Sequence, residues 1–328
     1  MTPLAPVLVA TITSATILGA LVGILAYVTL LERKFAARLQ SRIGPYRVGP
    51  HGLLQPIADG VKLLLKEHLV PESADRPIFN LAPVVFLVPC LLIFATIPFA
   101  PGIGVADLET GVLFFLAVSS LEIVGLFMAG WGSNNKYALL SVMRAVNQII
   151  SYDLPFLFAA LVPVMLAGSL RMSDIAAAQQ GLWFIAYPVL GQLAFFAYIV
   201  TAVAAENRAP FDILEAESEL VAGFRVEYSG MEFALIQLAE YAHVMGASFL
   251  GALLFLGAWA GPGPVWLGPV WFLLKALFVF LLLTWVRWSF VRIRVDQILT
   301  LSWKFLLPAT LTLLIATSFV VVWRHSGF

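Results

Sequence analysis

The chain has 328 residues, of which 61% are hydrophobic and only 12% are charged, and its mean hydropathy is +0.95. Because average soluble domains carry about 25% charged residues, this composition excludes an ordinary soluble fold and predicts an all-α polytopic membrane protein. The 19 basic and 19 acidic residues cancel, so net charge does not indicate a nucleic-acid partner. The single cysteine, Cys90, excludes an internal disulfide and a cysteine-ligated iron–sulfur cluster held by this chain alone.

Apolar runs of about 17 to 25 residues predict membrane-spanning helices. We expect about eight of them in one transmembrane domain that covers residues 1–328. The runs are Val7 to Leu31, Leu81 to Pro98, Val112 to Ala129, Ala145 to Leu166, Trp183 to Ala205, Met231 to Gly257, Val270 to Val286 and Phe305 to Trp323.

The segment from Leu53 to Leu69 has a different pattern. Its apolar residues recur at helical spacing opposite Lys62, Lys66 and Glu67. Because it is too short and too charged to cross a membrane, we expect an amphipathic helix that lies at the interface.

Most of the 19 Lys and Arg residues lie in the loops after the first, third, fifth and seventh predicted spans. The positive-inside rule therefore places these loops in the cytoplasm and both termini on the outer, periplasmic side. We expect a multi-pass protein of the bacterial inner membrane, surrounded by lipid.

Carboxylates are concentrated between Glu206 and Glu240, where local basic partners are few. The eight are Glu206, Asp212, Glu215, Glu217, Glu219, Glu227, Glu232 and Glu240. Four acids are expected within or at the mouth of spans, namely Glu122, Asp153, Glu206 and Glu240. Charges at such depth are costly and typical of function, so they predict a proton or cation path.

A structural role is the alternative for these acids. Glu122 would then pair with Arg144, and Asp153 with Lys275. Lys275 has a second alternative, in which its ammonium extends to the outer interface.

The first cytoplasmic loop combines Glu32, Arg33, Tyr46, Gln55 and Asp59 at the membrane border. Such a mixture beside an amphipathic helix suits a pocket for an amphiphile, with polar groups for its head and a gap for its apolar tail. The last cytoplasmic loop adds a second polar group, which either closes the same surface or docks a partner. Its residues are Arg292, Arg294 and Asp296.

Four stretches resemble the membrane subunit of respiratory complex I that adjoins the quinone site, the bacterial counterpart of subunit 1 of the mitochondrial NADH dehydrogenase. They pass through every predicted cytoplasmic loop in order, and the resemblance covers essentially the whole chain. They are LLERKFAARLQSRIGPYRVGPHGLLQPIADGVKLLLKE, WGSNNKYALLSVMRAVNQIISYDLP, AENRAPFDILEAESELVAGFRVEYSGMEFALIQLAEY and VRIRVDQ.

The resemblance implies a quinone-site and coupling subunit of a proton-translocating NADH:quinone oxidoreductase, with quinone as substrate. FMN and iron–sulfur clusters would belong to partner subunits, and this chain would hold no redox cofactor, metal or catalytic residue of its own. Partners would be the peripheral-arm subunits at the quinone site and the antiporter-like membrane subunits. The residues implied for the quinone tunnel or its border are Glu32, Arg33, Arg42, Asp59, Glu227 and Tyr228. Those implied for the proton path are Glu122, Asp153, Glu206, Asp212, Glu215, Glu217, Glu219 and Glu240.

Three positions depart from the usual pattern of this family. Asp153 stands where Glu is common, Leu214 where Pro is common, and Glu232 where Lys is frequent. Two alternative functions are the homologous subunit of a membrane-bound hydrogenase and a free-standing ion-coupled transporter. The tunnel-side stretch from Glu32 to Glu67 argues against the first, and the lack of a strong internal repeat argues against the second.

Overall fold

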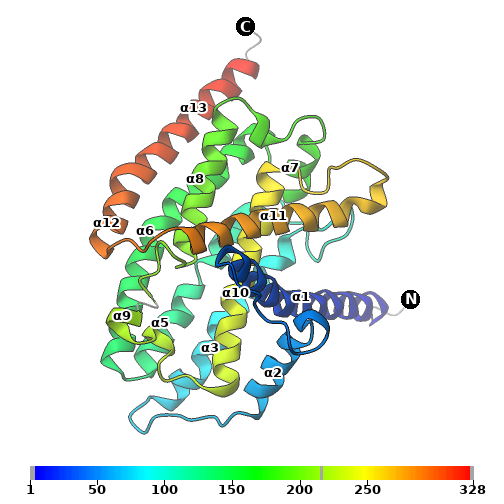
Figure 1. Cartoon of the computed structure of the whole chain (residues 1–328). Coiled ribbons are helices and arrows are strands. Elements are labelled where there is room, and N and C mark those ends of the chain that lie inside the picture. Colours follow the sequence, from blue (N-terminus) through cyan, green and yellow to red (C-terminus); the bar gives the residue numbers. More distant parts are fainter. Residues whose placement is uncertain (1–3, 215–216, 326–328) are drawn as a thin grey trace.

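Helices form the framework of the chain in the computed structural model, which describes residues 4–214 and 217–325 (Figure 1). The described residues contain no β-strand, which confirms the all-α class. The α-helices are α1 (Leu4–Leu39), α2 (Gln55–Leu65), α3 (Arg76–Leu92), α4 (Gly111–Ser119), α5 (Glu122–Gly132), α6 (Lys136–Ala167), α7 (Met172–Ala178), α8 (Leu190–Ala205), α9 (Glu217–Leu220), α10 (Gly230–Phe255), α11 (Gly268–Ser289), α12 (Val295–Leu301) and α13 (Leu307–His325).

Among the described residues, six segments are long and apolar enough to cross a membrane. They overlap six of the predicted spans and are Arg76–Thr96, Gly111–Gly132, Lys136–Ala167, Gly230–Phe255, Gly268–Ser289 and Val295–Arg324. The first predicted span lies in α1. The fifth contains α8, whose 16 residues extend only about 24 Å at 1.5 Å per residue. A multi-pass protein is therefore confirmed, whereas the number of eight spans and the orientation of the termini stay predictions.

Two predicted boundaries are wrong by several residues. The fifth span was expected to begin at Trp183, but α8 begins at Leu190, since the chain around Pro188 forms a turn after a short 3₁₀ segment. The last span was expected to begin at Phe305, but the helix begins at Val295 and runs through a π-helical turn, Ser302–Leu306, into α13. Asp296 thus lies in the first turn of a helix and not in a loop.

The third predicted span is interrupted at its centre, between α4 and α5. The hydroxyls of Ser119 and Ser120 donate to the carbonyls of Leu116 and Ala117, at 2.9 and 3.0 Å. Such back-bonding competes with the helical backbone and bends helices. The interruption makes Glu122 the first residue of α5, where the positive end of the helix dipole favours a carboxylate.

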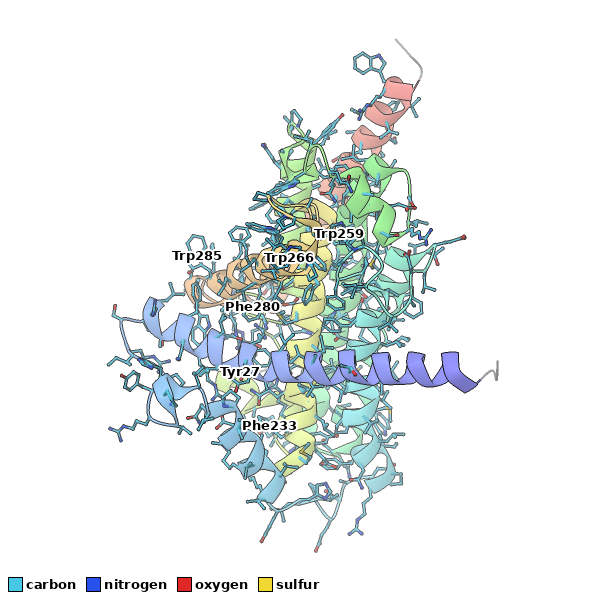
Figure 2. All side chains as sticks on the ribbon, turned by 90° about the vertical axis from the view of Figure 1, so that its right-hand side faces the viewer. Tyr27, Phe233, Trp259, Trp266, Phe280 and Trp285 are labelled. Atoms are coloured by element: carbon cyan, nitrogen blue, oxygen red, sulfur yellow. The ribbon has the colours of Figure 1, made fainter. Side chains whose placement is uncertain are left out.

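Helix α10 lies at the centre of the fold and contacts α1, α2, α3, α8 and α11. In the view of Figure 1, α3 and α10 run in similar directions while α11 lies across them, and both views show α1 running across α10 (Figures 1 and 2). This crossing brings the polar end of α1 and the last turn of α11 toward Tyr241, near the middle of α10. The charged groups described below occupy this region.

Helix α2 has the amphipathic character expected of it, and none of its residues is buried within this chain. It ends at Leu65, four residues before the predicted end, because the following segment bonds elsewhere. Ser229 donates to the carbonyl of Glu67, and His68 lies 2.7 Å from Glu232. These contacts hold the start of α10 against the segment after α2.

Glycine allows α3 and α5 to pack closely. A methyl group on Gly125 would overlap the backbone nitrogen and Cα of Phe86. We therefore expect Gly125→Ala to destabilise the protein by about 2 kcal/mol, the usual cost of overpacking, as a lower midpoint of thermal unfolding in detergent. Gly23→Ala is the control, since no heavy atom lies within 4 Å of its added methyl group. Equal midpoints for the two variants would contradict the close packing.

At the end of the molecule that holds α7, polar contacts fasten the loops (Figure 1). Arg171 and Asp107 form an ion pair at 2.6 Å, and their hydrogen bond lowers the pKa of Asp107 below its usual value. Lys275 donates to the carbonyl of Ala260 at 2.5 Å and lies over the ring of Trp183. The alternative in which Lys275 pairs with Asp153 is therefore wrong.

Candidate functional site

A buried cluster of three charges joins elements that are far apart in sequence. Glu32 of α1 is 2% exposed and lies 2.6 Å from Arg287 of α11 and 3.4 Å from Arg208, which follows α8. Tyr241 of α10 also bonds the Glu32 carboxylate, and its ring lies under the Arg208 guanidinium at 5.1 Å. Because a buried carboxylate is costly without partners, this arrangement fixes where α1 crosses α10 and α11.

A second buried pair lies deeper, where α5 faces α10. His243 Nδ1 is 3.0 Å from Glu122 Oε2, and the Cys90 thiol of α3 is 3.6 Å from the same oxygen. Asp153 of α6 lies within electrostatic range of both Glu122 and His243. The alternative in which Glu122 pairs with Arg144 is therefore wrong. A chain of titratable groups instead extends across α5, α6 and α10.

Between these two clusters lies a polar cavity of about 80 Å³, which we call the acid cavity. Its lining residues are Phe86, Glu122, Leu126, Glu206, Asn207, Arg208, Asp212, Leu214, Arg225, Gln237, Glu240, Tyr241, His243 and Arg287. Glu240 is paired with Arg225. Both carboxylate oxygens of Glu206 are buried without a hydrogen-bond partner among the described residues. The acid cavity therefore collects four predicted proton-path residues: Glu122, Glu206, Asp212 and Glu240.

A second cavity, of about 140 Å³, lies between α1, α2 and α10 and is called the entry cavity here. Its lining residues are Leu25, Ala26, Thr29, Arg33, Pro56, Asp59, Gly60, Leu63, Ala234, Gln237, Leu238 and Tyr241. Arg33 donates to Asp59 at 2.6 Å, and Gln55 donates to the other oxygen of Asp59 at 2.9 Å. Two predicted tunnel residues, Arg33 and Asp59, are thus brought together on its wall.

The two cavities share two lining residues, Gln237 and Tyr241, one turn apart on α10. The Tyr241 hydroxyl contacts Glu32, so the shared wall also touches the buried charge cluster. A change of charge or side-chain position in the entry cavity would therefore reach the acid cavity through the side chains of Gln237 and Tyr241.

Other predicted tunnel residues lie outside the lining of the entry cavity. Arg42 is exposed beyond the end of α1 and donates to Gln40 at 2.7 Å. Glu227 accepts from Asn135 at 2.7 Å, and Tyr228 stacks on Phe79 with ring centroids 4.2 Å apart. Glu227 and Tyr228 thus fasten the segment before α10 to α3 and to the start of α6.

Three further residues of the predicted acidic path lie between Asp212 and α10. Glu215 is outside the described residues, and Glu217 is the first residue of α9. Glu219 accepts from Arg144 of α6 at 2.6 Å. This hydrogen bond lowers the pKa of Glu219 below its usual value, so near neutral pH the group is a fixed negative charge.

The pairing of Glu219 gives a pH-dependent expectation for stability. A lowered pKa in the folded state stabilises above the unfolded value of about 4.3, and this contribution is lost as the pH falls through the folded value. We expect Glu219→Gln to lower the midpoint of thermal unfolding slightly at pH 7 and to match the unchanged protein near pH 3. Glu72→Gln, at an exposed position, is the control. A difference that persists unchanged at pH 3 would contradict the ion-pair account.

Four residues of the site were not singled out from sequence: Arg208, Gln237, Tyr241 and Arg287. Arg287 lies in the last turn of a span, where a basic residue is expected for topology alone. Its pairing with Glu32 depends on the crossing of α1 and α11, which the sequence pattern does not contain. Among the described residues, no group of three His, Cys, Asp or Glu side chains is arranged to hold a metal ion.

Fold and site together define the class of this chain, a polytopic all-helical membrane protein with charged groups buried between its helices. The sequence model of the family described as NADH dehydrogenase matches residues 12–318. The chain belongs to this family.

Three similar proteins are each named as the H subunit of NADH-quinone oxidoreductase. A relative from Dehalococcoides mccartyi (strain CBDB1) is 49% identical over 92% of this chain and 84% of its own length. One from Geobacillus kaustophilus is 47% identical over 94% of this chain and 93% of its own length. One from Polaromonas naphthalenivorans is 45% identical over 98% of this chain and 93% of its own length. These identities confirm the resemblance inferred from the cytoplasmic loops.

Proposed function

We propose that this chain is the quinone-site and coupling subunit of a proton-translocating NADH:quinone oxidoreductase in the bacterial inner membrane. Its relatives are named as the H subunit of NADH-quinone oxidoreductase. Peripheral-arm subunits with FMN and iron–sulfur clusters would deliver electrons to the quinone. Antiporter-like membrane subunits would respond to the resulting changes in protonation. The chain itself would supply the quinone path and the charged groups beside it.

The observation that carries this proposal is the pair of adjoining cavities that share Gln237 and Tyr241 of α10. One has an apolar wall with a single ion pair, Arg33 and Asp59, which suits an apolar tail and a small polar head. The other is polar and contains a buried carboxylate, Glu206, without a hydrogen-bond partner among the described residues. Gln237 and Tyr241 contribute to both walls.

In this proposal, a quinone head enters past Arg33 and Asp59 and is reduced by the peripheral arm. Reduction to the uncharged quinol takes up two electrons and two protons. If side chains beside the head supply the protons, those side chains become more negative by the same number of charges. Tyr241 and Glu32 lie next to this change, and a shift of either alters the field at Arg208 and Arg287. The carboxylates of the acid cavity then bind or release protons in response.

The acids of the predicted path are assigned different roles. Glu206, Glu122 and Asp153 would exchange protons, with His243 as the bonded partner of Glu122. Glu240 and Glu219, each paired with an arginine, would set the local field. Asp212, on the acid cavity wall, would join the exchange.

The first test is purification of the tagged chain from its native host in mild detergent. We expect it to copurify with flavin and iron–sulfur subunits and to support inhibitor-sensitive reduction of a short-chain quinone by NADH. Isolation of the chain with a hydrogenase, or without quinone reduction, would contradict the proposal.

The shared wall gives a sharper expectation. Gln237→Leu keeps the size of the side chain but removes its amide. A hydrogen bond from that amide to a quinone head would be worth roughly 1 kcal/mol, or about fivefold in rate. We expect NADH-driven quinone reduction to fall by about that factor while the complex remains assembled. Leu238→Met alters the entry cavity alone and is the control. Equal rates in both variants would show that the amide has no role.

A further inference from the structure

Helix α2 forms one wall of the entry cavity, yet none of its residues is buried within this chain. A helix with few buried side chains is held mainly by its polar contacts. The opposite wall belongs to α10, so the width of the cavity depends on how closely α2 lies against α10. Near its start, α2 is fastened to α1 through the pair of Arg33 and Asp59. The contacts at its other end decide whether this wall keeps a fixed position.

The end of α2 is tied to the first turn of α10, at the lower end of the molecule in Figure 1. The hydroxyl of Ser229 donates to the carbonyl of Glu67 and accepts from the N–H of Leu69, both at 3.2 Å. A methyl group on Gly230 would lie 3.1 Å from the carbonyl oxygen of Lys66, so the two backbones nearly touch. The segment after α2 therefore lies directly against the start of α10.

One pair of side chains completes this junction. His68 Nε2 lies 2.7 Å from Glu232 Oε1, and an imidazole can donate this bond whether it is neutral or protonated. The Glu232 side chain is 12% exposed, and its other oxygen is buried without a hydrogen-bond partner among the described residues. Losing His68 would leave a mostly buried carboxylate without this bond, which is costly. Glu232 lies two residues before Ala234, which is on the wall of the entry cavity.

We propose that His68 and Glu232, which we call the α2 latch, hold α2 against α10 and so fit the entry cavity to the apolar tail of a quinone. This inference rests on the proposed function, because it takes a quinone as the occupant of that cavity. Both are positioning residues, since neither lines the cavity and both act through the helices that do. Lys is frequent at position 232 in this family, and an ammonium offers His68 no acceptor, so the latch is particular to chains with an acid there.

The test compares two substrates of the intact complex, decylubiquinone, which carries an apolar tail, and duroquinone, which carries none. We expect His68→Leu to raise the KM for decylubiquinone about threefold at unchanged kcat, as for loss of a partly exposed ion pair. The KM for duroquinone should stay the same, because no tail lies against α2. Glu67→Gln is the control, since Glu67 is exposed and contacts Ser229 through its backbone carbonyl.

Exchanging the two charges separates their attraction from packing. Glu232→Lys alone should raise the KM for decylubiquinone at least as much as His68→Leu. The double variant His68→Glu, Glu232→Lys should return it to within a factor of about two of the unchanged protein. Amide hydrogen exchange over residues 55–69 of the same complexes should be faster in both single variants and slower again in the double variant.

The outcomes separate the latch from the proposed function. Unchanged exchange and an unchanged KM in His68→Leu would overturn the latch. Faster exchange with an unchanged KM would support the latch but overturn the assignment of the entry cavity to the quinone tail. An equal rise in KM for both substrates, or a fall in kcat, would indicate a general loss of structure and overturn the positioning role.

Discussion

Glu32→Ala is expected to abolish quinone reduction mainly by preventing stable assembly. Glu32 is the carboxylate that Arg208 and Arg287 share, and its removal leaves two guanidinium groups facing each other between α8, α10 and α11. Removing one partner of a buried ion pair costs about 3 kcal/mol or more, which is a large part of the stability of most domains. We therefore expect the equilibrium constant for folding to fall by roughly 100-fold, and the amount of assembled complex and its activity to fall together.

Matched variants separate loss of charge from loss of packing. Glu32→Gln keeps the size of the side chain and some hydrogen bonds, so we expect an intermediate loss. Arg38→Gln removes an exposed charge from the same helix and should change stability by no more than about 0.5 kcal/mol. The readouts are the yield of complex by native electrophoresis and the rate per assembled complex. Normal assembly of the Glu32→Ala complex would contradict the structural role given to this cluster.

The sequence was sufficient to predict the helices that a continuous stretch of residues determines by its hydropathy or its spacing. Hydropathy located α3, α6, α10 and α11, because an apolar run long enough for a bilayer has few other uses. The helical spacing of Leu53 to Leu69 predicted α2 for a similar reason. The boundaries of α8 and α12 were missed because turn and capping contacts decide them. One such contact is the bond from the Arg294 N–H to the Gln297 side chain at 3.4 Å.

Which charged side chains pair with one another between the helices could not be predicted in the same way. Glu122 was assigned Arg144 as an alternative partner from nearby sequence, whereas it pairs with His243, on a helix far along the chain. Arg287 acquires Glu32 only because α1 and α11 cross α10 at an inclination, and apolar length does not fix helix tilt. Composition thus identifies which charges are costly, while packing decides which of them meet.

Glu206→Gln gives the strongest test of coupling. The Glu206 carboxylate follows α8, both of its oxygens are buried in the acid cavity, and neither has a hydrogen-bond partner among the described residues. A buried carboxylate in such a site exchanges protons readily when a nearby charge changes, whereas an amide carries no exchangeable charge. We expect NADH oxidation to continue while proton translocation per NADH falls by more than about half.

The measurement is proton uptake into vesicles, with the rate of NADH oxidation recorded on the same preparation. Glu206→Asp keeps a titratable group and should retain most of the translocation, and Asp296→Asn, exposed on α12, should be unaffected. Glu240→Gln is a useful comparison because Glu240 is paired with Arg225. We expect this variant to lower the stability of the complex more than it lowers the number of protons translocated per NADH. A Glu206→Gln complex that translocates protons at full stoichiometry would remove Glu206 from the path. The buried pair of Glu122 and His243, which lines the same cavity, would then be the next group to test.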